Sequence, residues 1–117
     1  DGRKEIHGLR TLWMMYAVGE NYILPLSHDE VVHGKRSLIG RMPGDWWRQF
    51  AGARLLPMYA ACHPGGMLSF MGNEFAQFIE WRDYEELEWF LLQHATHAGV
   101  QAFIRALNHI YRAEKAL

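Results

Sequence analysis

The stretch YILPLSHDEVVHGK, residues 22–35, joins a short apolar run to a dense group of polar side chains. Residues 21–27 are apolar without alternation, which is typical of a strand buried on both faces in a parallel sheet. Pro25 argues against this, because it cannot donate to a strand ladder. Two imidazoles, two carboxylates and a lysine follow directly. Because α/β folds place their chemistry at strand exits, this stretch predicts both a fold class and a site.

Helix signals and apolar spacing predict the other elements. Residues 9–18 are mostly apolar and suit a helix or a buried connection that ends at Gly19. Asp45 is placed to cap a helix from Trp46 to about Ala61, which Pro57 should kink. The apolar face of that helix is predicted to contain Trp47, Phe50, Ala51, Leu55, Met58 and Tyr59.

A second short strand is predicted at residues 67–71, followed by an irregular region with short helical turns between residues 75 and 89. The last helix carries a clear amphipathic stripe, formed by Val100, Phe103, Ile104, Leu107, Ile110 and Tyr111. The order helix, strand, helix, strand, helix implies a parallel strand pair with a right-handed crossover. Two parallel strands cannot cover their own faces and edges, so residues 1–117 are expected to be one piece of a larger α/β structure.

Composition narrows the function classes. The chain has 117 residues, half of them apolar, which fits one domain with a core. Lys and Arg total 12 against 13 acidic residues, so a nucleic-acid partner is not expected. No apolar run reaches the ~18 residues of a membrane span. Cys62 is the only cysteine of the sequence, which excludes an internal disulfide and suits a cytoplasmic location.

Three groups of side chains are candidates for chemistry. His28, Asp29 and Glu30 follow the first strand, and in an extended segment His28 and Glu30 would share one side with Asp29 on the other. Glu74 holds the matching place after the second strand, as a functional acid or as an ordinary partner of Arg82 or Lys35. Trp81 is the aromatic residue best placed to stack on a sugar ring, although most aromatic side chains fill cores.

A zinc site built from His28, Glu30 and His33 is an unfavoured alternative. The zinc motif His-Glu-x-x-His places two imidazoles one helical turn apart, whereas these are five residues apart. Serine-nucleophile and phosphate-loop motifs are absent from the sequence. The remaining histidines, including His63 and His97, are expected to be structural or surface groups.

Several runs resemble the bacterial 1,4-alpha-glucan branching enzymes of the alpha-amylase superfamily. They are residues 20–35, with the continuation Asp-Glu-Val-Val-His-Gly-Lys that related amylases lack, Met-Pro-Gly-Asp at 42–45, residues 68–77, and Leu-Asn-His-Ile-Tyr-Arg at 107–112. Eukaryotic-type branching enzymes usually carry Gln in place of Glu30. The resemblance implies a partial (β/α)8 TIM barrel, with this chain supplying about strands 7 and 8 and their helices at the C-terminal side of the catalytic domain.

The resemblance also implies roles for individual residues. Asp29 would stabilise the transition state of a retaining reaction, and His28 would bind the same sugar. Lys35, Glu74 and Gln77 would line the glucan groove. The catalytic nucleophile and the acid/base would come from parts of the parent enzyme outside this chain, so the chain alone is expected to be inactive. No cofactor or metal is implied, and the expected partners are an α-glucan and the remainder of the enzyme.

Two alternatives remain open at this stage. One is another α-glucan hydrolase of the same superfamily, which would release reducing ends instead of forming α-1,6 branches. The other is a non-catalytic glucan-binding or structural piece.

Overall fold

A computed structural model describes residue 19 and residues 21–117. Two strands, β1 (Ile23–Leu26) and β2 (Gly66–Ser69), pair in parallel. Helix α2 (Trp46–Ala61) connects them, and α3 (Ala95–Ala113) ends the described fold. The strand, helix, strand, helix order and the parallel pairing are therefore confirmed. The helix or connection predicted at residues 9–18 lies outside the described residues.

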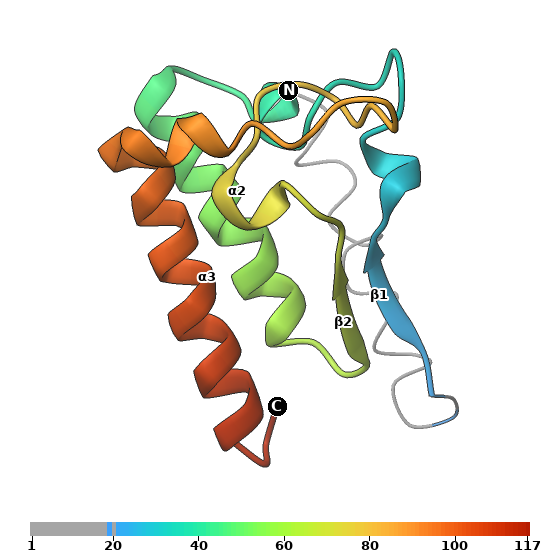
Figure 1. Ribbon diagram of the computed structural model, residues 1–117. Helices are drawn as coiled ribbons and strands as arrows, with labels where there is room; N and C mark the ends of the chain where they lie inside the picture. The colour runs from blue at the N-terminus through green and yellow to red at the C-terminus, as the bar shows by residue number, and fades with distance from the viewer. Residues whose placement is uncertain (1–18, 20) are drawn as a thin grey trace.

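The two helices lie to one side of the strand pair, with α2 next to β2 and α3 packed on α2 (Figure 1). The strands are shorter than predicted, and the burial on both faces predicted for the first strand is wrong for the described residues, since Ile23 is 61% exposed. In β2, Leu68 is 39% exposed. The reason is that each strand has one strand neighbour among the residues described. An edge position also accommodates Pro25, which has no N–H to offer a second neighbour.

The start of the strand pair depends on a glycine. The backbone N–H of Gly66 donates to the carbonyl of Tyr22 at 2.9 Å. The preceding residue, Gly65, has a φ of 112°, and a Cβ there would lie 2.9 Å from the same carbonyl oxygen. Only glycine takes up this backbone conformation without strain. The Tyr111 hydroxyl donates to the Gly65 carbonyl at 3.1 Å, so α3 is tied to the same turn.

Helix α2 begins and ends where the sequence predicts. The Asp45 carboxylate accepts a hydrogen bond from the Arg48 backbone N–H at 2.9 Å, which confirms the predicted N-cap. Most members of the predicted apolar face are exposed among the described residues, with Trp47 71% and Leu55 58% exposed. Apolar residues surround α2 over a wider arc than α3 and β2 cover, so a single stripe is buried: Phe50, Ala53, Pro57 and Ala61.

The core lies between α2, α3 and the two segments around residues 39 and 76. It contains Ile39, Phe50, Ala53, Ala76 and Val100, with Ile104 packed against it. His97 is also buried, and its Nδ1 lies 2.9 Å from the carbonyl oxygen of Phe75, so its structural reading is confirmed. The stripe of α3 is buried at Val100 and Leu107, but Ile110 is 53% exposed. No described helix is both long and apolar enough to cross a membrane.

Candidate functional site

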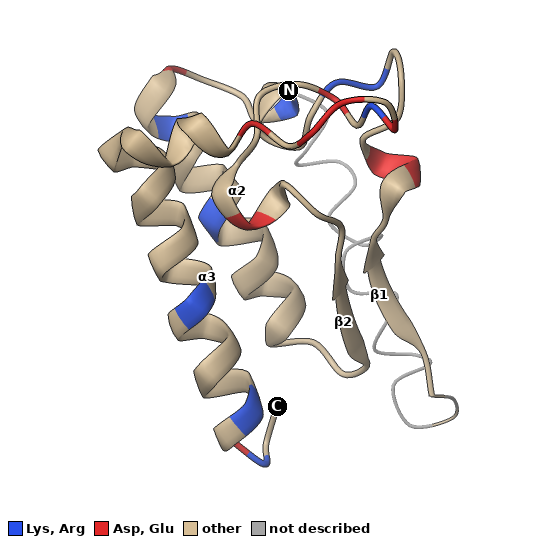
Figure 2. Ribbon diagram, in the orientation of Figure 1, with Lys and Arg blue, Asp and Glu red and all other residues tan. Residues whose placement is uncertain are grey.

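The polar residues after β1 form one turn of 3-10 helix, His28–Glu30, and do not continue the strand. Hydrogen bonds from Glu30 N to Ser27 O (3.1 Å) and from Val31 N to His28 O (2.8 Å) close this turn. The alternation expected of an extended segment is therefore wrong here. Charged residues are concentrated in the loops at this end of the strands, whereas the helices contain few (Figure 2).

The turn brings His28 and Asp29 together at the carboxyl end of β1. His28 Nε2 lies 3.3 Å from Asp29 Oδ1, and the side chains are 51% and 72% exposed. The imidazole also contacts two aromatic rings: Phe70 in a tilted arrangement at 6.1 Å, and Trp81 edge-on at 5.8 Å between ring centroids. The aromatic contacts restrain the imidazole, while the carboxylate keeps acceptor capacity for hydroxyl groups that arrive from solvent.

Lys35 reaches the same turn, and Glu30 turns away from it. The Lys35 ammonium donates to the backbone carbonyl of Asp29 at 2.7 Å. The Glu30 carboxylate instead pairs with the Arg41 guanidinium at 3.2 Å. Of the predicted residues, His28, Asp29 and Lys35 are thus brought together.

Glu74 lies at a different place. Gly72, with a φ of 91°, turns the chain after β2 into the short helical turn Asn73–Phe75. Glu74 borders a hollow whose other walls include Met67 of β2 and Leu107 and Asn108 of α3. Within the described residues it makes neither of the two ion pairs considered from the sequence.

The predicted alternative partners of Glu74 are engaged elsewhere. Arg82 Nη1 lies 3.0 Å from Glu85 Oε2, and the hydrogen bond to Glu85, followed by Coulomb attraction, raises the pKa of the Arg82 guanidinium. Lys35 is bound to the Asp29 carbonyl. Glu74 therefore lines the hollow beside α3 without an ion pair to either of these residues in the described part of the chain.

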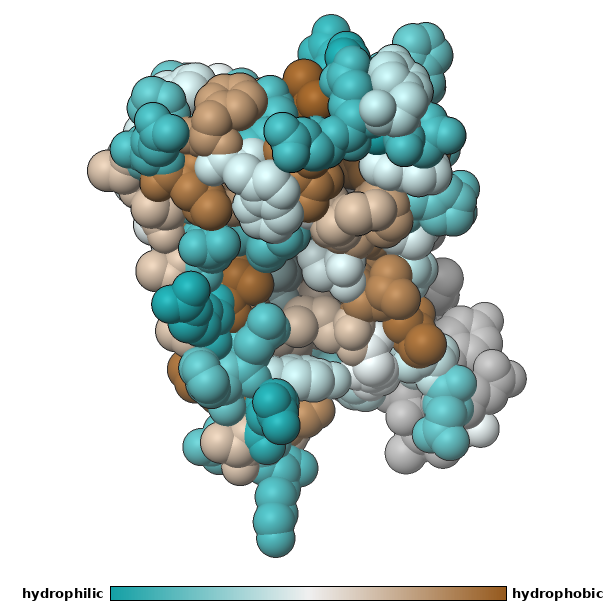
Figure 3. Space-filling model, in the orientation of Figure 1, coloured by the Kyte–Doolittle hydropathy of each residue, from teal (hydrophilic) through white to brown (hydrophobic). Residues whose placement is uncertain are grey.

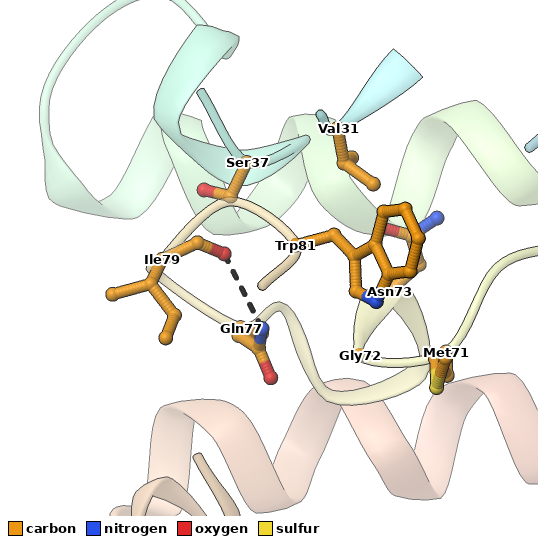
Figure 4. A pocket seen from close by; sticks show the side chains of 8 residues that line it. All are labelled: Val31, Ser37, Met71, Gly72, Asn73, Gln77, Ile79 and Trp81. Carbon is orange, nitrogen blue, oxygen red and sulfur yellow. Dashed lines mark hydrogen bonds between the residues drawn. The ribbon is translucent and has the colours of Figure 1, made fainter. Parts of the chain in front are cut away.

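Gln77 is buried and holds backbone groups. Its Nε2 donates to the Ile79 carbonyl at 3.3 Å, and its Oε1 accepts from the Glu88 N–H at 3.1 Å. It lines a small hollow with Val31, Asn73 and Trp81, among other residues (Figure 4). Trp81, the predicted stacking residue, is accordingly half-buried between this hollow and His28.

Two residues of the candidate site were not predicted from the sequence. Phe70 supplies one of the rings beside His28. Glu80 lies 46 residues from Gly34 in sequence, yet its carboxylate accepts the Gly34 N–H at 2.9 Å. The only sequence signals were that Phe70 lies within the second predicted strand, residues 67–71, and that Glu80 precedes Trp81.

The described part of the chain gathers no group of three His, Cys, Asp or Glu side chains of the kind that holds a metal ion. Glu30 is paired with Arg41, and His33 Nδ1 lies 3.0 Å from Glu80 Oε1. The geometry thus offers hydrogen-bond acceptors and an imidazole at a strand exit, which suits recognition of a polyhydroxylated ligand.

Known proteins match the chain closely, although no protein-family model does. The 1,4-alpha-glucan branching enzyme of Aquifex aeolicus is 54% identical over 115 residues, which is 98% of this chain. The enzymes of the same name from Oceanobacillus iheyensis and Bradyrhizobium diazoefficiens are 53% and 54% identical over 115 residues. The chain spans 18%, 18% and 16% of the length of these three relatives.

The resemblance drawn from the motifs is confirmed by these matches. Identity above one half extends over nearly the whole chain, not over the motifs alone. This similarity places the chain in the family of bacterial 1,4-alpha-glucan branching enzymes, as the counterpart of one segment of those proteins.

Proposed function

We propose that this chain is part of the catalytic domain of a 1,4-alpha-glucan branching enzyme, in which His28 and Asp29 bind the sugar at the cleavage point. The parent reaction transfers an α-1,4-glucan segment to a 6-hydroxyl and forms an α-1,6 branch. The observation that carries the proposal is the exposed His28–Asp29 pair at the end of β1, in a chain 54% identical to a protein of that name.

Asp29 acts in this proposal through its charge and its acceptor capacity. A retaining reaction passes through transition states that resemble an oxocarbenium ion. A fixed carboxylate that accepts hydrogen bonds from the sugar hydroxyls stabilises the positive charge as it develops. His28, restrained by Phe70 and Trp81, binds the same sugar. The nucleophile and the acid/base belong to other segments of the parent enzyme, so the chain alone should form no branches.

The other predicted residues have supporting roles in this proposal. Lys35 lies beside Asp29, where its ammonium group borders the same sugar-binding face. Glu74 is proposed to line the groove from the β2 side. For Gln77 the geometry favours support of the groove wall over contact with glucan, because both ends of its amide already bind backbone.

We also propose that the chain is the C-terminal part of a (β/α)8 barrel, about strands 7 and 8, in a cytoplasmic enzyme. Parallel strands joined by a helix suit this architecture. Hydrophobic side chains lie on the surface of the helices and strands, as Figure 3 shows for one face. They are the groups that further barrel segments would cover, and include Ile23, Trp47, Leu55, Met58, Leu68 and Met71.

The test uses a chimera, defined as the Aquifex aeolicus relative with its matching segment replaced by this chain. We expect the folded chimera to convert amylose to a product with new α-1,6 linkages. Asp29→Asn should lower its turnover at least ~100-fold, as expected for loss of one preorganised transition-state group. Asp83→Asn, at an exposed turn, is the matched control and should leave turnover unchanged.

Each component of the proposal can fail separately. A folded chimera that makes reducing ends and no branches would indicate a hydrolase, and one that does neither would indicate a binding or structural segment. Near-normal branching by Asp29→Asn would remove Asp29 from the mechanism. Branch formation by the isolated chain would contradict the placement of the nucleophile and the acid/base outside it.

A further inference from the structure

Glu80 holds the loop that carries Lys35. One oxygen of its carboxylate, Oε2, accepts the backbone N–H groups of Gly34 at 2.9 Å and Arg36 at 3.2 Å. The other oxygen, Oε1, lies 3.0 Å from His33 Nδ1. Backbone N–H groups bound to a carboxylate form charge-assisted hydrogen bonds, which are stronger than neutral ones. We call these three contacts the Glu80 clasp.

The clasped loop needs such a restraint. Residues 33–36 are exposed, and the His33 side chain is 99% exposed, so burial contributes little to the loop conformation. Arg36 has a φ of 64°, a region that side-chain-bearing residues rarely occupy. Such a residue persists where its surroundings impose the conformation. The hydrogen bond from its own N–H to Glu80 is part of those surroundings.

The clasp is connected to His28 and Asp29 at two points. Within the loop, the Lys35 ammonium donates to the Asp29 carbonyl at 2.7 Å. Directly after Glu80, the Trp81 backbone N–H donates to the Val31 carbonyl at 2.7 Å. The Trp81 ring then meets the His28 imidazole edge-on, at 5.8 Å between centroids. A shift of residues 80 and 81 would therefore displace both members of the pair.

We propose that Glu80 is a positioning residue for the reaction of the parent enzyme, acting through Lys35 and Trp81 on the geometry of Asp29 and His28. The inference rests on the proposed function. In this role Glu80 acts through the contacts of its carboxylate with the loop, and not through contact with substrate. It holds the exit loop of β1 against the segment that follows β2, so that the Asp29 carboxylate faces the sugar at a fixed place.

The experiment is a double-mutant cycle in the chimera, with kcat and KM for amylose measured separately. Glu80→Ala should lower kcat by ~10- to 100-fold, because small misplacements of a catalytic group carry losses of that size. In an Asp29→Asn background the same substitution should lower kcat by no more than ~2-fold, since the group it positions is already lost. If Glu80 only supported the fold, the fold losses in kcat of the two single variants would multiply in the double variant.

Two further variants separate shape from charge. Glu80→Gln retains one oxygen able to accept both backbone N–H groups, and should keep kcat within ~3-fold of the parent. Glu85→Ala is the matched control, because Glu85 pairs with the exposed Arg82 and lies outside the clasp. It should leave kcat unchanged. If Glu80→Ala fails to fold, Glu80→Asp takes its place in the cycle, since it keeps the charge but withdraws the carboxylate by one methylene.

Hydrogen exchange provides a readout that does not depend on activity. The amides of Gly34 and Arg36 should exchange faster in Glu80→Ala than in the parent, and at the parent rate in Glu85→Ala. Parent-like kcat in Glu80→Ala, or losses that multiply in the cycle, would overturn the positioning role. Near-normal turnover in the Asp29→Asn single variant would instead overturn the proposed function, so the two failures are distinguishable.

Discussion

The strand-exit region and the helical core are held together by different forces. At the exit, most of residues 28–36 are exposed and residues 80–81 are partly buried, and hydrogen bonds to backbone groups hold these segments together. In the core, Ile39, Phe50 and Val100 are fixed by burial. Substitutions at the exit should therefore alter chemistry with little change in the free energy of unfolding, and substitutions in the core should do the reverse.

The largest expected effect on stability is at Phe75. This side chain is fully buried and packs against Trp89, with ring centroids 5.1 Å apart. Phe75→Ala should lower the free energy of unfolding by about 3–5 kcal/mol, through lost burial and the cavity left behind. Urea unfolding of the chain, followed by circular dichroism, measures this. Phe90→Ala is the matched control, since Phe90 is 59% exposed and its loss should cost less than ~1 kcal/mol.

An intermediate effect is expected at the start of α2. Asp45→Ala removes the acceptor of the Arg48 N–H and should lower the free energy of unfolding by about 1 kcal/mol. Asp83→Ala, also at an exposed position, should change it by less than ~0.5 kcal/mol. Equal effects of the two substitutions in urea unfolding would show that the cap contributes nothing to stability.

The smallest effect on stability is expected at the exit itself. Glu30→Gln weakens the pair with Arg41, whose side chains are 46% and 35% exposed respectively. Exposed ion pairs contribute little, so the free energy of unfolding should change by less than ~0.5 kcal/mol. A loss as large as that of Asp45→Ala would mean that the exit region also supports the fold. Stability would then not be confined to the helical core.

Local signals in the sequence predicted the helices well. Asp45 before Trp46 marked the start of α2, and the apolar stripe through Val100 and Leu107 marked α3. These signals succeed because capping and helical periodicity involve residues within a few positions of each other. The parallel pairing followed from element order alone.

Side-chain placement could not be predicted in the same way. Trp47 and Leu55 belong to the predicted apolar face, but which arc of α2 is covered depends on where α3 and β2 pack. The turn at His28–Glu30 replaced the expected extended segment. The contact between Glu80 and Gly34 joins residues that are 46 positions apart, and no local pattern encodes such a contact.

The tight turn at Gly65 has a consequence that reaches beyond its own position. Any side chain added there would press on Tyr22, the residue that precedes β1, and would force the backbone out of its positive φ. Both strands would then lose their common starting point, since Gly66 N and Tyr22 O begin the pairing. A substitution at Gly65, far from Asp29, would thus shift both strands together. The loops at the opposite ends of the strands would then be misaligned.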